Sequence, residues 1–339
     1  MQSVEFSVMS TRGDRDLRGI AWRADFPRAV LQISHGMIEH IGRYAGLAEY
    51  LNGHGVSVYG HDHLGHGMTS PDERGYIAER DGDEHLVDDL HAVTVRIREE
   101  NPSIPLFVLG HSMGSYVLRR YITRYGTDID GAIIMGTGNQ SGASVAIGKA
   151  VASVLCAVKG PMARSAFLDR IVLSSNDGHF KDSDLPNRWL SKDTGNVERY
   201  NSDPMTSFGF TASAYRDLFT LVQKDIRLTD GEGIPKDLPV ILMSGTDDPI
   251  GGFGKGVARA ARGLKGLGLH PEVMMYDGRH EILNDTCSKE VMDDILDWIL
   301  GRIGRSAWTR TRRSSGRGPR RSDSDAPPRN RPTGSSIPL

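Results

Sequence analysis

Cysteine is scarce in this chain of 339 residues, which contains only Cys156 and Cys287. Two thiols cannot form the disulfide framework of a small secreted protein, so the sequence favours a reducing, cytoplasmic location. The chain has no uninterrupted apolar run of about 18 residues. Residues 1–16 also lack the basic start and apolar centre of a secretory signal. We therefore expect neither a transmembrane helix nor a signal peptide.

The chain also has little net charge, because its 41 Lys and Arg nearly balance its 43 Asp and Glu. The balance hides an asymmetry, since residues 305–339 contain nine Arg and two Asp and the rest of the chain is acidic. This tail is rich in Arg, Ser, Pro and Gly and offers little for a core to bury, so we expect it to be disordered. A solvated extension is the simplest interpretation. The alternative is peripheral contact with an anionic membrane rather than with a specific nucleic acid.

Short runs of Val, Ile and Leu alternate with helix-length segments along most of the chain. Two early runs, 4–9 and 18–24, are expected to form an opening antiparallel pair. The later runs are nearly continuous, which is typical of strands buried on both faces of a parallel sheet. The alternation predicts an α/β fold, with helices on both faces of a mostly parallel sheet. The expected parallel strands are 29–34, 56–60, 106–109, 133–135, 240–243 and 273–276, and the expected helices include 44–51, 113–125 and 290–303.

One stretch, from residue 139 to residue 210, interrupts this alternation and contains no clear parallel strand. We expect a helical lid, inserted after the sixth strand, that roofs the sheet. One face of its first helix is apolar, and we expect that face to pack on the body of the protein; the alternatives are that it lines an acyl pocket or touches a membrane. The apolar face consists of Ile147, Val151, Val154, Leu155 and Val158. The predicted organisation is a core in two parts (1–138 and 211–304), the lid (139–210) and the tail (305–339).

Residues 110–114 read Gly-His-Ser-Met-Gly, between the apolar run PLFVL and the helical segment SYVLRRYITRY. A turn this sharp leaves no room for side chains two positions before and after Ser112, which explains Gly110 and Gly114. The turn lifts the serine hydroxyl above the sheet at a helix N-terminus, where free N–H groups favour a developing negative charge. The pattern predicts that Ser112 is a nucleophile rather than an incidental serine in a glycine-rich turn.

A serine that attacks a carbonyl needs hydrogen-bond donors for the oxyanion that forms. We expect one donor to be the backbone N–H of Met113, the residue after the nucleophile. The run AVLQIS leads directly into His35-Gly36-Met37. We expect the N–H of Met37 to be the second donor, while its side chain only packs in the wall of the site.

The serine also needs a histidine that accepts its proton and a carboxylate that orients the imidazole. Among the twelve histidines, His280 directly follows a late predicted strand, in PEVMMYDGRH. The run PVILMSG leads to Thr246-Asp247-Asp248-Pro249, so two adjacent carboxylates compete for the orienting role. Pro249 stiffens the loop beside Asp248, which favours Asp248, and Asp247 is the alternative.

A second group of histidines, His61, His63 and His66 beside Asp62, suggests a metal site. Their spacing does not match a common zinc-hydrolase pattern, and the serine chemistry is complete without an ion. We therefore expect no metal and no cofactor. We expect a tight loop after the strand, in which side chains bond to the backbone.

Several segments follow the motif pattern of one known group of enzymes. Residues 35–51 resemble HGxxEHxxRYxxLA, residues 61–70 are similar to a DxxGHGxS loop, and GHSMGS differs from GHSMGG at Ser115. Residues 198–205, the GTDDP segment and residues 277–285 resemble the same group's lid-end, acid and histidine segments. The chain thus resembles the monoacylglycerol lipase and lysophospholipase group of the α/β-hydrolase superfamily. The match runs from about residue 21 to residue 303 and is loose over the lid helices, 141–192.

The resemblance implies an α/β-hydrolase fold with Ser112, His280 and Asp248 as a catalytic triad, since GTDDP aligns with the group's GxxD. It implies acyl transfer from a lipid-like ester, such as a monoacylglycerol or a lysophospholipid, without a cofactor. Two alternatives share the fold: a short-chain carboxylesterase, and a peptidase of the proline-iminopeptidase type. The peptidase would need an acidic group to hold an amino terminus, and Glu39 is the only obvious candidate. A non-catalytic binding protein is the third alternative.

Overall fold

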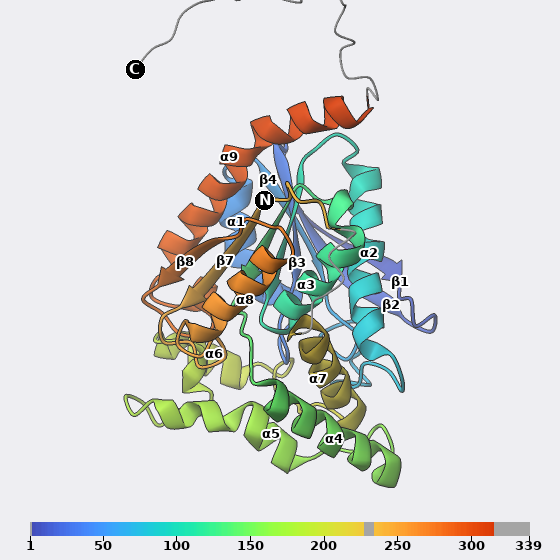
Figure 1. Cartoon of the computed structure of the whole chain (residues 1–339), viewed down its shortest axis with the longest axis vertical. Helices are drawn as coiled ribbons and strands as arrows, with labels where there is room; N and C mark the ends of the chain where they lie inside the picture. The colour runs from blue at the N-terminus through green and yellow to red at the C-terminus, as the bar shows by residue number, and fades with distance from the viewer. Residues whose placement is uncertain (1, 227–233, 315–339) are drawn as a thin grey trace, which may run out of the picture.

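The computed structural model describes residues 2–226 and 234–314, in which one eight-stranded sheet carries helices on both faces (Figure 1). The strand order is β1-β2-β4-β3-β5-β6-β7-β8. The β1–β2 and β2–β4 pairs are antiparallel, and all other neighbours are parallel. This confirms the predicted α/β-hydrolase fold. The strands are β1 (Gln2–Met9), β2 (Asp16–Arg23), β3 (Ala29–Ser34), β4 (Val56–His61), β5 (Leu106–His111), β6 (Gly131–Met135), β7 (Val240–Gly245) and β8 (Glu272–Tyr276).

The central strands β3 to β7 are buried along their whole length, as their continuous apolar runs indicate. Two hydrophobic cores lie on opposite faces of the sheet, because successive side chains of a strand point to opposite sides. One core lies between the sheet and helices α2, α3, α7 and α8, and the other lies between the sheet and helices α1 and α9. These helices are α1 (Ala45–Asn52), α2 (Gly82–Glu100), α3 (Met113–Tyr125), α7 (Ala212–Ile226), α8 (Lys255–Gly266) and α9 (Ser288–Ser314).

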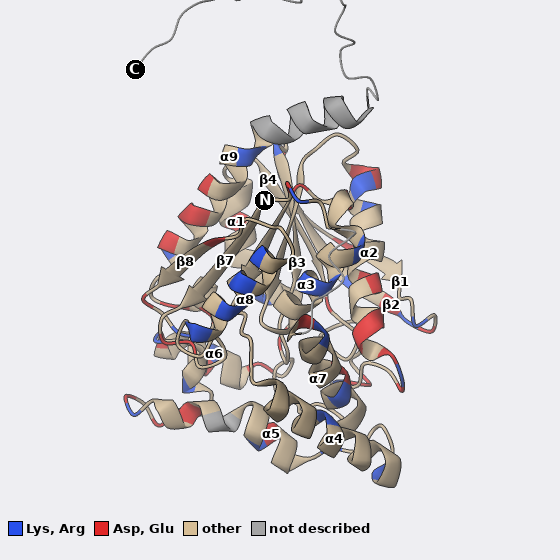
Figure 2. Ribbon diagram, viewed as in Figure 1, with Lys and Arg blue, Asp and Glu red and all other residues tan. Residues whose placement is uncertain are grey.

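The lid helices lie between β6 and α7 in the sequence, and Figure 1 shows α4 and α5 beyond one end of the sheet. They are α4 (Gly142–Lys159), α5 (Ala166–Val172) and α6 (Thr194–Ser202). Helix α4 packs on α7 through small residues: Ala152 is buried, and the ring of Phe219 lies against Gly148. Figure 2 shows α4 and α5 almost without acidic residues, in contrast to α2 and α9.

Only part of the predicted apolar face of α4 is covered: Leu155 packs against the core, and Ile147 and Val151 line a cavity. Ile147, Val154 and Val158 are 66%, 63% and 76% exposed. The reason is that the close packing of α4 on α7 uses Gly148 and Ala152, which turns the larger apolar side chains outward. Among the helices of residues 2–226 and 234–314, α4 is the one that is long and apolar enough to cross a membrane by length and composition. The sequence criterion missed it because lysines interrupt the apolar run.

Helix α9 continues to Ser314, well past the predicted end at residue 303 and into the stretch expected to be disordered. Residues 305–314 contain no Pro or Gly, and Arg and Ala are good helix formers, so the helix has no local signal to end earlier. The rest of the predicted tail, residues 315–339, lies outside the described residues.

Candidate active site

Ser112 occupies the turn between β5 and α3, with backbone angles φ 51° and ψ −116°. This left-handed conformation is unusual for a residue with a side chain and costs about 1–3 kcal/mol, so it persists only where the surroundings impose it. A Cβ on Gly110 would collide with the backbone of Gly114, and one on Gly114 would collide with the carbonyl of Ser34. The two glycines therefore allow the strand, the helix and the β3 loop to meet at the serine.

The structure brings the three predicted triad residues together. The His280 Nε2 atom lies 2.8 Å from the Ser112 hydroxyl, and its Nδ1 atom lies 3.0 Å from the Asp248 carboxylate. His280 and Asp248 are both buried. Burial alone would raise the pKa of Asp248, but the charge and hydrogen bond of His280 and the N–H groups of Gly251 and Ile250 outweigh it and lower the pKa. Asp248 therefore stays ionised and can hold the imidazole.

The neighbouring carboxylate, Asp247, points away from the histidine. Its side chain is 45% exposed and forms an ion pair with Lys192, with 2.9 Å between the Nζ and the carboxylate oxygen. Its own N–H donates to the carbonyl of Gly278. Of the two competing aspartates, the structure places only Asp248 in contact with His280.

The loop after β3 is fixed on both sides of Met37. The N–H of Gly36 donates to the Glu39 carboxylate, and the N–H of Ile38 donates to the His66 Nε2 atom at 3.2 Å. Met113 begins α3, where the first N–H groups have no acceptor within the helix. Met37 and Met113 both line the cavity that contains Ser112. Met37 and Met113 thus reach the cavity of Ser112 from separate, anchored segments, and their role as oxyanion donors stays a prediction.

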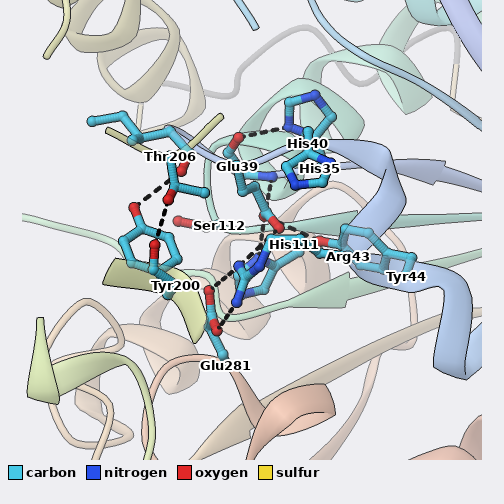
Figure 3. Close-up of polar contacts among 12 residues, drawn as sticks. His35, Glu39, His40, Arg43, Tyr44, His111, Ser112, Tyr200, Thr206 and Glu281 are labelled. Carbon is cyan, nitrogen blue, oxygen red and sulfur yellow. Dashed lines mark hydrogen bonds and ion pairs between the residues drawn. The ribbon is translucent and has the colours of Figure 1, made fainter. Parts of the chain in front are cut away.

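A buried charge network surrounds the oxyanion loop, and the sequence analysis did not find it. Glu39, which is 3% exposed, accepts hydrogen bonds from His111 (2.9 Å) and Tyr44 (3.1 Å) as well as from Gly36. Burial would raise the pKa of Glu39, but the hydrogen bond and charge of His111 and the charge of Arg43 outweigh it and lower the pKa. Figure 3 shows Glu39 directed at His111, the residue before the serine.

Arg43 connects this network to the histidine loop. Its guanidinium donates two hydrogen bonds to the Glu281 carboxylate, at 2.5 and 2.7 Å, and Glu281 directly follows His280 (Figure 3). Asn196 of α6 donates to the same carboxylate at 2.9 Å. Burial would raise the pKa of Glu281, and Arg43 lowers it. The available sequence signal was the spacing of Glu39 and Arg43, four residues apart in a segment with apolar neighbours.

Replacing Glu39 by glutamine is expected to destabilise the protein by about 3 kcal/mol near pH 5.5, because a buried ion pair loses one charge. Because the pKa of Glu39 is lower in the folded protein than its ordinary value of 4.5, ionised Glu39 stabilises the fold fully above pH 4.5. This stabilisation is lost as the pH falls towards the pKa of the folded protein. Burial would lower the pKa of His111, but Glu39 outweighs burial and raises it above the ordinary value of 6.5. Protonated His111 therefore stabilises the fold fully below pH 6.5, and this stabilisation is lost as the pH rises through the pKa of the folded protein.

The stability difference between wild type and Glu39→Gln should therefore be largest between the two ordinary pKa values and should shrink on either side. Urea unfolding at several pH values measures it. A difference that does not vary with pH would contradict the ionised pair.

The four histidines His35, His61, His63 and His66 are buried and packed ring against ring. Burial lowers the pKa of His35 to about 4 and of His61 and His66 to about 3, so these rings are neutral at pH 7. Within the described part of the chain, neither these histidines nor any other group of three or more His, Cys, Asp or Glu side chains is arranged to hold a metal ion. Asp62 accepts hydrogen bonds from the N–H groups of Ile41 and Met68, both at 2.8 Å, which is the tight loop that the sequence predicts.

A cavity of about 560 Å³ opens at Ser112 and extends beneath the lid. Its wall has two chemically different parts. Helices α4, α5 and α7 provide mostly apolar side chains, among them Ile147, Val151, Phe167, Ile171, Leu218 and Val222. The part beside the serine is polar, with Glu39, His111, Tyr200 and Glu281.

The fold, the strained serine at the end of β5 and its contact with a histidine and an aspartate define the class of serine hydrolases on the α/β-hydrolase fold. The chain belongs to the Hydrolase_4 family, described as serine aminopeptidase, S33, whose pattern matches residues 25–287. Within that family it is similar to the monoacylglycerol lipase and esterase group.

Three proteins illustrate the similarity. The monoacylglycerol lipase of Mycolicibacterium smegmatis is 28% identical over 317 residues, which cover 87% of this chain and all of the relative. The monoglyceride lipase of Mus musculus is 27% identical and covers 82% of this chain and 84% of the relative. The structure of a thermostable carboxyl esterase from Bacillus coagulans, in complex with glycerol, superposes with a TM-score of 0.83 at 26% identity. It covers 89% of this chain and 99% of the esterase.

Proposed function

We propose that this protein hydrolyses esters of long-chain fatty acids with a small neutral alcohol, in the manner of a monoacylglycerol lipase. The observation that carries the proposal is the two-part cavity at Ser112. An amphiphilic ester needs an apolar wall for its acyl chain and polar groups for its alcohol, with the scissile carbonyl between them. The wall from α4, α5 and α7 provides the first, and the polar side chains beside the serine provide the second.

The proposed mechanism is acyl transfer in two steps. The Ser112 oxygen attacks the ester carbonyl while its proton moves to the His280 Nε2 atom, and Asp248 stabilises the resulting imidazolium. The N–H groups of Met37 and Met113 hold the oxyanion until the alcohol leaves with the proton from His280. Water then attacks the acyl-enzyme by the same route, which releases the fatty acid and restores the serine.

The charges in the cavity favour a neutral alcohol over a phosphate headgroup. Glu39 and Glu281 lie on the polar side, and both stay ionised because their pKa values are lowered. Arg43 pairs with both carboxylates, so among the described lining residues the polar end offers a phosphate headgroup no unpaired cation, whereas a neutral alcohol needs none. A monoacylglycerol therefore fits this site better than a lysophospholipid does.

The same residues count against the peptidase alternative. Glu39, the candidate for holding an amino terminus, already accepts hydrogen bonds from Gly36, His111 and Tyr44. A panel of p-nitrophenyl esters of rising chain length, 1-monoacylglycerols, lysophospholipids and aminoacyl-naphthylamides would test the proposal. Turnover of the naphthylamides above that of the esters would overturn it.

The preference for acyl-chain length is expected to depend on Val151, which lines the cavity from α4. Each methylene that the cavity buries adds about 0.8 kcal/mol, so kcat/KM should rise with chain length until the cavity is full. Val151→Trp should shorten the preferred chain. Val154→Trp is the matched control, because Val154 lies on the same helix and points to solvent. A flat chain-length profile in the wild type would leave only a general esterase.

For the basic tail we propose contact with anionic lipid. Deleting residues 315–339 should weaken binding to vesicles that contain phosphatidylglycerol at low salt, and the difference should fade as salt screens the charges. Turnover of a soluble short ester should not change. Equal vesicle binding with and without the tail would support a solvated extension without a role.

A further inference from the structure

Arg279, the residue before the proposed catalytic histidine, is a buried cation that holds part of the lid. It is 5% exposed, and its guanidinium donates to the carbonyls of Arg188 (2.7 Å) and Ser191 (3.2 Å). It also donates to the carboxylate of Asp182 at 2.5 Å and lies 3.9 Å from the ring centre of Phe180. All four partners belong to residues 180–192, which we call the lid strap.

Two further contacts attach the strap to the histidine loop. The N–H of Glu281 donates to the carbonyl of Leu190 at 2.7 Å. The Asp285 carboxylate accepts the N–H of Arg279 at 2.7 Å with one oxygen and the N–H of Lys192 at 2.9 Å with the other. The strap therefore forms bonds with both neighbours of His280 and with the end of its loop.

The strap also provides one wall for the imidazole. The ring centres of Trp189 and His111 each lie 4.9 Å from the ring centre of His280. Trp189 is buried. His280 must keep one ring nitrogen on Ser112 and the other on Asp248, so packing against two neighbouring rings restricts the tilts that would break either contact.

From these contacts we infer that Arg279 is a positioning residue, which fixes the lid strap so that Trp189 keeps His280 aligned with Ser112. The inference rests on the proposed hydrolase function. The physical basis is that a buried cation is costly unless it is paired, and the strap supplies the two Nη groups of Arg279 with two carbonyls and a carboxylate and its planar face with an aromatic ring. If the strap moves away, the cation loses these partners, so the strap stays in place and holds the tryptophan.

The test uses the full-length protein with the variants Arg279→Gln, Arg279→Lys and Asp182→Asn, and with Asp184→Asn as the matched control. Asp184 is an exposed carboxylate of the same strap, and no ion pair of it is seen in the part of the chain that the structure describes. Three quantities are measured: kcat and KM for a short soluble p-nitrophenyl ester, the rate at which a fluorophosphonate labels Ser112, and the rate of tryptic cleavage at Lys181.

For Arg279→Gln we expect kcat and the labelling rate to fall about 10-fold and KM to change less, because the histidine is misplaced while only Trp189 and Leu190 of the strap line the cavity. Arg279→Lys should recover part of the loss, since the charge near Asp182 returns. Asp182→Asn should lower kcat and the labelling rate by about 3-fold, as expected for an ion pair with one exposed partner. Trypsin should cleave these variants faster at Lys181. Asp184→Asn should match the wild type in every measurement.

Faster cleavage with unchanged kcat and labelling would overturn the inference, because the strap would then be a tether with no effect on the histidine. If Arg279→Gln fails to fold, Asp182→Asn decides the question, and wild-type labelling and kcat in that variant also overturn it. Labelling depends only on activation of the serine. The two proposals can therefore fail separately. If the wild type cleaves none of the esters but the Arg279 variants are still labelled more slowly than the wild type, the role of Arg279 is upheld and the lipid-ester substrate is rejected.

Discussion

Ser112→Ala is expected to lower ester hydrolysis by about 10⁶-fold, since removing the nucleophile of such a triad costs about as much as removing the whole triad. The hydroxyl that the substitution deletes lies 2.8 Å from the His280 Nε2 atom, and no other hydroxyl is seen to bond to that atom within the described residues. The measurements are turnover of a p-nitrophenyl ester and labelling by a fluorophosphonate probe.

The fold should survive this substitution, because alanine has no bulk beyond that of serine. Circular dichroism and the melting temperature would show it. Ser202→Ala is the control, because Ser202 lies on the exposed end of α6 and its hydroxyl donates to a carbonyl of its own helix, with no other partner seen among the described residues. If Ser112→Ala still labels at the wild-type rate, the nucleophile is another residue.

Asp248→Asn is expected to lower kcat by about 10⁴-fold, because an amide cannot hold the imidazole in the required tautomer. The effect should fall on kcat rather than on KM, since Asp248 lies behind His280 and is fully buried. Steady-state kinetics with a soluble ester measure the two constants separately.

The adjacent Asp247→Asn is a closely matched control, with the same chemical change one position earlier in the chain. Asp247 is half-exposed and bound to Lys192, so its substitution should change kcat by less than about 3-fold, as for other surface ion pairs. If Asp247→Asn lowered kcat more than Asp248→Asn, Asp247 would be the residue that orients His280. That result would also mean that the loop after β7 rearranges when the enzyme works.

The fold, Ser112 and His280 could be predicted from the sequence because each depends on local pattern, whereas local pattern favoured Asp248 over Asp247 without deciding between them. Continuous apolar runs indicate buried strands, and glycines two positions either side of Ser112 indicate a sharp turn between β5 and α3. The strands of the structure agree with the predicted ranges to within one or two residues at most ends. Among the predicted helices, α9 differs from its predicted range, because it ends at Ser314 rather than at residue 303. Its end depends on where Pro and Gly next occur rather than on an apolar pattern.

The orientation of α4 could not be predicted, because an apolar helix face does not specify what covers it. The sequence analysis left open what covers the larger side chains, and the structure buries Ala152, places Gly148 against Phe219 and leaves Val154 and Val158 exposed. Which face of a helix packs inward depends on how closely two backbones can approach. That is decided by the shape of the partner helix, α7, which lies far along the chain.

The sequence by itself thus determined the sheet, the sharp turn between β5 and α3, and the choice of Ser112 and His280 as candidate catalytic residues. The reason is that turn sterics and strand burial are properties of short segments. Only the tertiary structure showed that Asp248, rather than Asp247, touches the histidine, and that Glu39, Arg43 and Glu281 form one buried network. These contacts join residues separated by tens to hundreds of positions. Charged side chains are buried only where partners from distant segments compensate their lost hydration, and a linear pattern does not contain that information.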